Sequence, residues 1–210
     1  MRRACTVRRS GARKSLLLWI AAAALAALLA GCGGAAGGTA DGPGGAAAKH
    51  PDGTEKMTAV ATFFPLYDFA SRIGGGRVEA VSLIPTGVEP HDWTPKSRDM
   101  MRIAEAGVFI YQGAGFEGWI GDVLAGVDTS RTAIVEASAG IELIDADPHT
   151  WLSPRSALRM AENILDGLVR ADPEHEAEYR ENYEKLRAEL TALDAAYAER
   201  LGGAARREMV

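Results

Sequence analysis

The sequence predicts an α/β fold in which a parallel sheet is flanked by helices and followed by one long helix. Over residues 57–172, short apolar stretches alternate with stretches that have helical spacing, and the connections between them are short. This alternation is typical of parallel βαβ units. Over residues 173–201, apolar residues instead follow a single helical stripe. We therefore expect an α/β lobe and then a long helix.

The first half of this lobe contains two expected strands and two expected helices. The stretch 57–64 is rich in β-forming residues, and 66–75 has helical spacing with two glycines at its end. Residues 77–85 alternate as a strand does. In the next helix we expect Thr94 to be the N-cap and Pro95 the first helical residue, because these residue types are favoured there.

The second half continues the alternation. Stretches 107–113 and 132–138 are expected strands, with a helix over 116–126 between them. Ser153-Pro154 and Asp172-Pro173 each look like a cap followed by the first residue of a helix. The apolar stripe of the last helix consists of Tyr179, Tyr183, Leu186, Leu190, Leu193, Tyr197 and Leu201. Such a helix is roughly 40 Å long, which suits either a strut between two lobes or a coiled-coil seam.

The N-terminal region predicts export and lipid anchoring. Residues 1–31 carry six cations, no acid, and then an apolar run of the length found in secretory signal peptides. The run ends in Leu-Ala-Gly-Cys, which resembles the lipobox of bacterial lipoproteins, so we expect cleavage before Cys32 and acylation of its thiol. A plain signal peptide and an uncleaved anchor are the alternatives. Cys5 is lost with the signal peptide, which excludes disulfides and free thiolate sites from the exported chain.

The segment that follows predicts a tether, and the charge excludes one class of partner. Residues 32–56 consist largely of Gly, Ala, Pro and Asp, a composition that is typical of flexible linkers. The net charge is −5, and loss of the six cations in 1–31 brings it to −11. An exported domain this acidic is a poor binder of nucleic acid, so we expect no nucleic-acid partner.

Two of the four histidines lie in matching contexts. His91 and His149 each follow a proline, precede a tryptophan by two residues, and have a carboxylate close by in the sequence. Both fall in loops that follow expected strands, where ligands of open α/β sheets bind. We expect both to bind one zinc or manganese ion. The residues that we expect to support these ligands without touching the ion are Asp92, Trp93, Asp147 and Trp151.

The other two histidines are not expected to be ligands. His50 lies in the tether, and His175 falls in the first turn of the last helix among glutamates. We expect His50 to be solvated and His175 to be an exposed residue of the helix cap.

Three segments carry a resemblance to a known family. "ATFFPLYDFASRIGG", "LIPTGVEPHDWTPKSRD" and "DPHTWLSPRSALRMAENI" resemble the matching parts of the zinc- and manganese-binding lipoproteins that serve ABC importers as solute-binding receptors. The resemblance covers residues 57–210 and includes the lipobox. It implies two α/β lobes joined by a long helix, a metal ion in the cleft, a partner permease, and an extracytoplasmic, lipid-anchored location. His91 and His149 match the two histidines of the family's N-terminal lobe.

The family pattern also predicts what this chain holds. The family takes its other two ligands from the second lobe, and residues 202–210 match only the start of that lobe. We therefore expect lobe 57–172, inter-lobe helix 173–201 and half of a two-lobed metal receptor, with zinc preferred over manganese. The His-rich acidic loop of some zinc-binding members is absent between the two histidine motifs.

Two other functions are compatible with the residues. A secreted zinc hydrolase could use His91 and His149 as ligands and Glu117 as a base, but the sequence has no HExxH pair. A lipid-anchored adhesin with a structural metal is the other possibility. The expected activity remains metal binding without catalysis.

Overall fold

The computed structural model describes residues 53–205, which belong to one compact unit. The expected signal peptide 1–31, the acylated Cys32, and the expected tether up to residue 52 lie outside the described residues, as do residues 206–210. Within residues 53–205, none of the helices combines the length and the apolar character needed to cross a bilayer.

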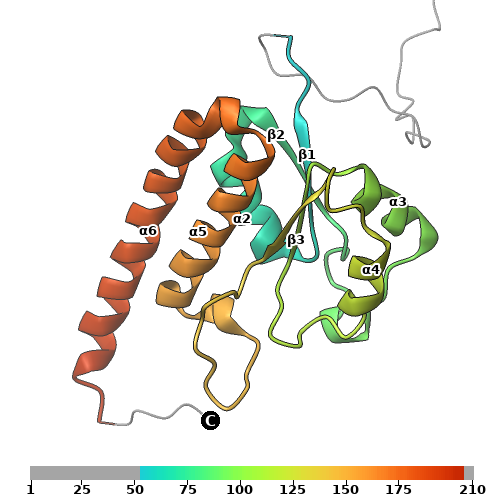
Figure 1. Ribbon diagram of the computed structural model, residues 1–210. Coiled ribbons are helices and arrows are strands. Elements are labelled where there is room, and N and C mark those ends of the chain that lie inside the picture. Colours follow the sequence, from blue (N-terminus) through green and yellow to red (C-terminus); the bar gives the residue numbers. More distant parts are fainter. Residues whose placement is uncertain (1–52, 206–210) are drawn as a thin grey trace, which may run out of the picture. The chain divides into compact units, whose positions relative to one another are not determined.

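A four-stranded parallel sheet with strand order β2-β1-β3-β4 forms the centre of the fold. In chain order the elements are β1 (Met57–Ala61), α2 (Phe64–Gly74), β2 (Val78–Ser82), α3 (Ser97–Glu105), β3 (Val108–Tyr111), α4 (Ile120–Gly126), β4 (Ala133–Glu136), α5 (Pro154–Ala171) and α6 (Glu176–Gly202). Figure 1 shows this arrangement. The chain passes from β1 to one neighbour and then crosses to the other, so the topological switch point lies between β1 and β3.

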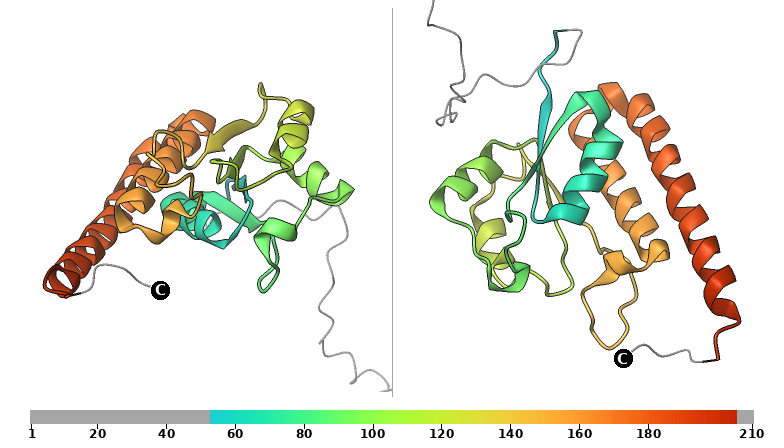
Figure 2. Two further views of the ribbon diagram at one scale, coloured as in Figure 1. Left: turned by 90° about the horizontal axis from the view of Figure 1, so that it is seen from below. Right: turned by 180° about the vertical axis from the view of Figure 1, so that it is seen from behind.

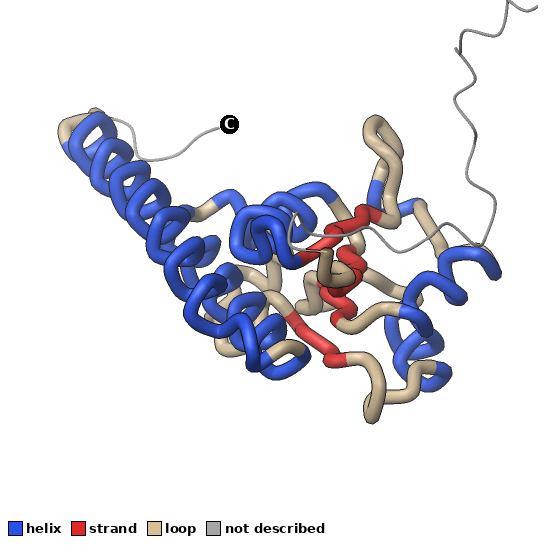
Figure 3. Tube along the Cα trace, turned by 90° about the horizontal axis from the view of Figure 1, so that it is seen from above, coloured by secondary structure: helices blue, strands red, loops and turns tan. Residues whose placement is uncertain are grey.

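Helices cover both faces of the sheet, as the alternation predicts. Helices α2 and α5 pack on one face, where the larger cluster of buried apolar residues includes Leu66, Ile110 and Ile164. Helices α3 and α4 cover the other face, around Phe109 and Ile103. The strands lie between these two layers of helices in Figure 3. The buried apolar side chains of all four strands therefore stabilise the frame from which the loops extend.

Helix α6 packs along α2 and α5 rather than on the sheet. The two longest helices, α5 and α6, run side by side in both views of Figure 2. Its apolar stripe is covered only in part. Tyr179 and Leu186 are fully buried, whereas the last three members of the stripe are 46–59% exposed. Those three are Leu193, Tyr197 and Leu201. A role of this helix as a connection between lobes stays a prediction.

The strands and helices follow the sequence predictions except at some helix starts. Helix α3 begins at Ser97 with Lys96 as its N-cap, and Thr94 and Pro95 precede it outside any helix or strand, so the predicted cap is wrong. The buried Asp99 carboxylate accepts a hydrogen bond from the Lys96 N–H at 2.9 Å and caps the helix there. Helix α4 likewise begins at Ile120, later than predicted. In contrast, α5 begins at Pro154 with Ser153 as its cap, as predicted.

Candidate metal centre

His91 lies in the loop that follows β2, an edge strand of the sheet. Pro90, His91 and Asp92 form a single 3₁₀ turn, and the Glu89 carboxylate accepts a hydrogen bond from the His91 N–H at 3.3 Å. The imidazole is exposed, and this local turn is its main backbone support. The proline predicted a stiff loop, and the turn that it starts holds His91 over the carboxyl end of the sheet.

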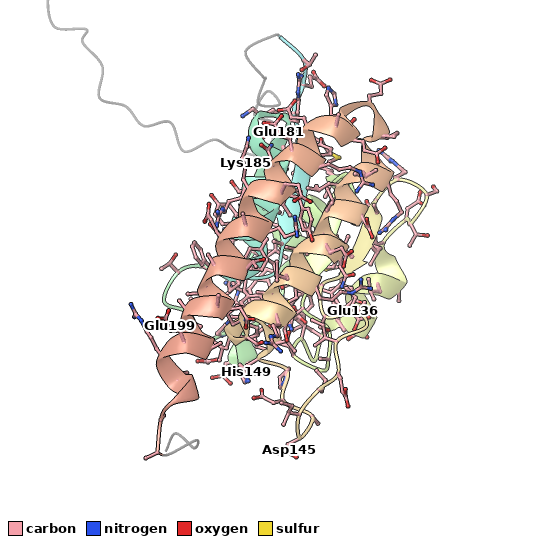
Figure 4. All side chains as sticks on the ribbon, turned by 90° about the vertical axis from the view of Figure 1, so that its left-hand side faces the viewer. Glu136, Asp145, His149, Glu181, Lys185 and Glu199 are labelled. Atoms are coloured by element: carbon pink, nitrogen blue, oxygen red, sulfur yellow. The ribbon has the colours of Figure 1, made fainter. Side chains whose placement is uncertain are left out.

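His149 reaches the same place from the opposite edge strand, β4. It precedes a 3₁₀ turn over Thr150–Leu152 that leads into α5, and the loop before it contains two residues with positive φ, Asp145 and Ala146. Figure 4 shows His149 near the first turn of α5, with Asp145 in the loop before it. Left-handed backbone is unfavourable for alanine, so this loop adopts a specific and costly conformation.

The carboxylate of Asp147 orients His149. Its Oδ1 atom accepts the His149 N–H at 3.0 Å and lies 2.5 Å from Nδ1 of the imidazole. These two hydrogen bonds, the backbone one first, hold the pKa of Asp147 below its usual value. With Nδ1 protonated and bonded to Asp147, the lone pair of the neutral ring is on Nε2. The free Nε2 is the nitrogen that faces His91.

The two imidazoles meet although they are 58 residues apart in the chain. Their Nε2 atoms are 3.2 Å apart, and the ring planes are inclined by 69°. Two nitrogens bound to one tetrahedral zinc ion at ~2.0–2.1 Å would be about 3.3–3.4 Å apart. The donor set and its spacing therefore fit a shared ion. The role of His91 and His149 as ligands stays a prediction, but the structure brings them together as expected.

A cluster of aromatic side chains packs against the two imidazole rings. The ring of Phe116 lies 4.7 Å from that of His91 and 6.0 Å from that of His149, measured between centroids. Trp151 contacts Phe116, Phe63 and His149 at centroid distances of 4.7–5.2 Å. Phe63 and Phe116 are buried. This apolar surface keeps water from one side of the imidazoles and restricts their rotation.

The support residues predicted beside His91 are placed differently from those beside His149. Trp93 packs on Trp119 at 5.4 Å and contacts neither imidazole ring. Asp92 is exposed, and within residues 53–205 its carboxylate has no hydrogen bond or ion pair. Their supporting role stays a prediction, and the structure gives it contacts only on the His149 side.

Glu117 does not face the imidazoles. Its carboxylate is buried and accepts hydrogen bonds from the Thr62 hydroxyl at 2.7 Å and from the N–H groups of Gln112 and Gly113 at 2.8 and 3.1 Å. Burial raises the pKa of Glu117, and these hydrogen bonds oppose the rise. A base must reach a bound water, and the buried carboxylate is bonded to Thr62 and the backbone instead. The hydrolase interpretation thus loses its base.

Sequence reasoning missed two residues of this site. Phe116 touches both imidazoles, and the Gln112 side chain bonds to the residues on either side of His149. Neither lies near a histidine in the sequence. The only local signal was a polar residue at the end of the apolar run 108–111, where a strand meets the carboxyl edge of the sheet.

Over the described part of the chain, no group of three or more His, Cys, Asp or Glu side chains is arranged to hold a metal ion. Among the described residues, the candidate metal centre therefore consists of the imidazoles of His91 and His149. His175 is half-buried, and its Nδ1 lies 2.7 Å from Asp172, which also accepts the Tyr179 hydroxyl at 2.6 Å. The predicted exposure of His175 is wrong, because this network holds it against the start of α6. His50 lies outside the described residues.

Comparison with known proteins gives consistent matches. The sequence profile of the family described as zinc-uptake complex component A, periplasmic (ZnuA), matches residues 59–210. The high-affinity zinc uptake system protein ZnuA of Bacillus subtilis is 30% identical over 175 residues, which are 74% of this chain and 55% of the relative. The chain thus spans about half the length of that curated relative.

Solved structures of similar proteins share the fold. The crystal structure of the metal-dependent lipoprotein YcdH from Bacillus subtilis matches with a TM-score of 0.66 and 35% identity, over 69% of this chain and 55% of that one. The Zn(II)-bound ZnuA-like domain of Streptococcus pneumoniae AdcA matches with a TM-score of 0.69 and 31% identity, over 72% of this chain and 58% of that domain. The fold and its parallel sheet are thus those of metal-binding receptors.

Proposed function

The chain belongs to the family of the periplasmic component A of the zinc-uptake complex, and from this membership we propose that it binds zinc outside the cytoplasm for delivery to an ABC importer. The observation that carries the proposal is the pair of Nε2 atoms 3.2 Å apart at the carboxyl edge of the sheet. His91 and His149 are the proposed ligands. Water, or groups outside residues 53–205, would complete the coordination of the ion.

Zinc is preferred over manganese for chemical reasons. Neutral imidazole suits zinc, and affinities at nitrogen sites rise strongly from manganese toward zinc. The similar proteins of Bacillus subtilis and Streptococcus pneumoniae are a zinc uptake protein and a Zn(II)-bound domain, which also supports zinc. Manganese remains the second candidate, because the two ions differ mainly in the ligands that complete the site.

The proposed location follows from the N-terminal sequence. Acylation of Cys32 would anchor the exported chain to the membrane, with residues 33–56 as the tether, and a permease of the ABC class would be the partner. The name of the similar Bacillus subtilis structure includes the word lipoprotein, which supports this proposal.

A competition titration tests the proposed activity. The purified chain is titrated with Zn²⁺ in the presence of a chromophoric chelator, and Mn²⁺ is used in parallel. We expect one zinc per chain, reversible removal by excess chelator, and a dissociation constant on the order of micromolar or weaker for two imidazoles. Manganese should bind more weakly. Absence of saturable zinc binding would refute the proposal, and zinc-dependent hydrolysis of ester or peptide substrates would favour the enzyme instead.

A further inference from the structure

We propose that Gln112 is a positioning residue for the metal centre, and this inference rests on the proposed zinc site. Gln112 directly follows β3 and is fully buried. Its side-chain Nε2 donates hydrogen bonds to the carbonyl of Pro148 at 2.9 Å and to the hydroxyl of Thr150 at 2.8 Å. One amide group therefore holds the chain immediately before and immediately after His149.

The backbone of Gln112 is itself held on both sides. Its N–H donates to the buried Glu117 carboxylate at 2.8 Å, and its carbonyl accepts the N–H of Ser138 at 3.0 Å. The next residue, Gly113, has a φ of +79°, which starts the sharp turn that leads to Glu117. The donor thus extends from a rigid point between β1 and β4, beside the switch point of the sheet.

The cost of this arrangement argues for a specific role. Within residues 53–205, the Oε1 atom of Gln112 is buried without any hydrogen-bond partner. An apolar side chain of the same size would avoid the cost of desolvating that oxygen. The amide is therefore a poor filler of space. What it adds is the pair of donors to the His149 loop.

The contact matters because a metal centre tolerates little displacement. A ligand misplaced by about 1 Å is enough to make a designed site ineffective. The loop before His149 includes two residues in left-handed backbone, which favours other conformations once the loop is released. We infer that the Gln112 amide keeps the Nε2 atom of His149 within reach of the ion that His91 binds.

The test compares two isosteric substitutions. Gln112→Met removes the donors and keeps the volume. The control is Thr132→Val, which removes another buried side-chain bond, from the Thr132 hydroxyl to the Ala106 carbonyl at 2.9 Å, at the amino end of the sheet. We expect zinc affinity to fall about tenfold in Gln112→Met, as is usual for residues that orient ligands, and to stay within about twofold in Thr132→Val. Both variants should lower the unfolding temperature.

A second readout needs no metal. In the zinc-free chain, nuclear Overhauser effects between the imidazole rings of His91 and His149 should be present in the wild type and in Thr132→Val, and weak or absent in Gln112→Met. If Gln112→Met does not fold, Gln112→Asn takes its place under the same expectations, because its side chain is one methylene shorter and cannot reach both acceptors.

The outcomes separate this inference from the proposed function. Wild-type zinc affinity and unchanged nuclear Overhauser effects in the Gln112 variant would overturn the positioning role and leave the zinc site intact. Equal decreases of affinity in both variants would also overturn it, because they would reflect stability alone. A wild-type chain that binds no zinc, with imidazole rings that separate only in the Gln112 variant, would refute the proposed function but support the positioning role.

Discussion

The two histidine loops share a motif in sequence and are unequal in structure. Each contains Pro-His-x-Trp after an edge strand of the sheet. In the His149 loop, the Asp147 carboxylate bonds to the imidazole of His149, and the Gln112 amide bonds to the backbone. Trp151 connects this loop to the buried aromatic cluster. His91 itself lies in a local turn capped by Glu89, and among the described residues its ring contacts Phe116 besides His149.

The difference teaches that a repeated motif can supply two ligands of which one is held in place more firmly than the other before the ion binds. His149 is held in one orientation before any ion arrives, so little conformational entropy is lost there on binding. His91 lies in an exposed loop with fewer contacts, so the ion restricts its imidazole further on binding. We therefore regard the His149 side as the fixed half of the centre and the His91 side as the adaptable half.

The largest effect expected is the loss of either ligand. His91→Ala and His149→Ala should each reduce zinc affinity by more than about 100-fold, because loss of a ligand should exceed the 10–100-fold effects of residues that only orient one. His175→Ala is the control, because it removes a histidine that is bonded to Asp172 instead. Chelator competition measures all three. Wild-type affinity in either of the first two variants would remove that histidine from the site.

The next effect distinguishes the two loops directly. Asp147→Asn should weaken zinc binding about tenfold, because the amide can no longer hold Nδ1–H of His149 as a carboxylate does. Asp92→Asn should change the affinity less than about twofold, since the Asp92 carboxylate has no bonded partner among the described residues. Isothermal titration with Zn²⁺ compares the two variants. Equal decreases would mean that the loops are supported alike, contrary to the comparison.

Replacement of the two tryptophans should affect zinc affinity differently but lower the stability of the chain by similar amounts. Both are half-buried against the core, so Trp151→Ala and Trp93→Ala should each lower the free energy of unfolding by about 2–3 kcal/mol. Only Trp151 contacts an imidazole. Zinc affinity should therefore fall about fivefold in Trp151→Ala and stay within about twofold in Trp93→Ala. Denaturant unfolding and zinc titration on the same samples check this, and a larger decrease of affinity in the Trp93 variant would contradict it.

Much of the fold and the location of the site could be predicted because their signals are local. The alternation of strands and helices and the Ser153-Pro154 start of α5 are encoded in neighbouring residues, and the structure agrees with them. The prediction that the helix is capped by Thr94 was wrong because two capping signals, Thr94-Pro95 and Asp99, compete there. Asp99 caps the backbone at Lys96, and its burial decides the outcome. Tertiary burial is not visible in a local pattern.

The support of the site could be predicted only in part for the same reason. The sequence placed the same kinds of residue beside both histidines, but it could not distinguish Asp147, which contacts its histidine, from Asp92, which does not. The Gln112 amide bonds to residues 36 and 38 positions away. Such contacts depend on how the strands are ordered in the sheet, and strand order follows from the packing of the whole chain.

The smallest effect expected concerns Glu117, whose buried carboxylate bonds to Thr62 and to the backbone after β3 and not to either histidine. Because burial raises its pKa in the folded state, the folded chain binds more protons than the unfolded chain between the two pKa values. The free energy of unfolding should therefore fall as pH rises through that window, which begins near the unfolded value of about 4.3. Glu117→Gln lacks this titration, so its stability relative to the wild type should improve as pH rises from about 4 and then level off.

Urea unfolding of both chains at a series of pH values measures this difference. Glu105→Gln is the control for the loss of one negative charge, because Glu105 is exposed and has no bonded partner among residues 53–205. Stabilities of Glu117→Gln and wild type that run parallel over the whole series would show that the hydrogen bonds from Thr62, Gln112 and Gly113 cancel the effect of burial. The expected curve would instead show that burial of the Glu117 carboxylate lowers the stability of the fold, whereas the contacts of Asp147 and Gln112 support the His149 loop.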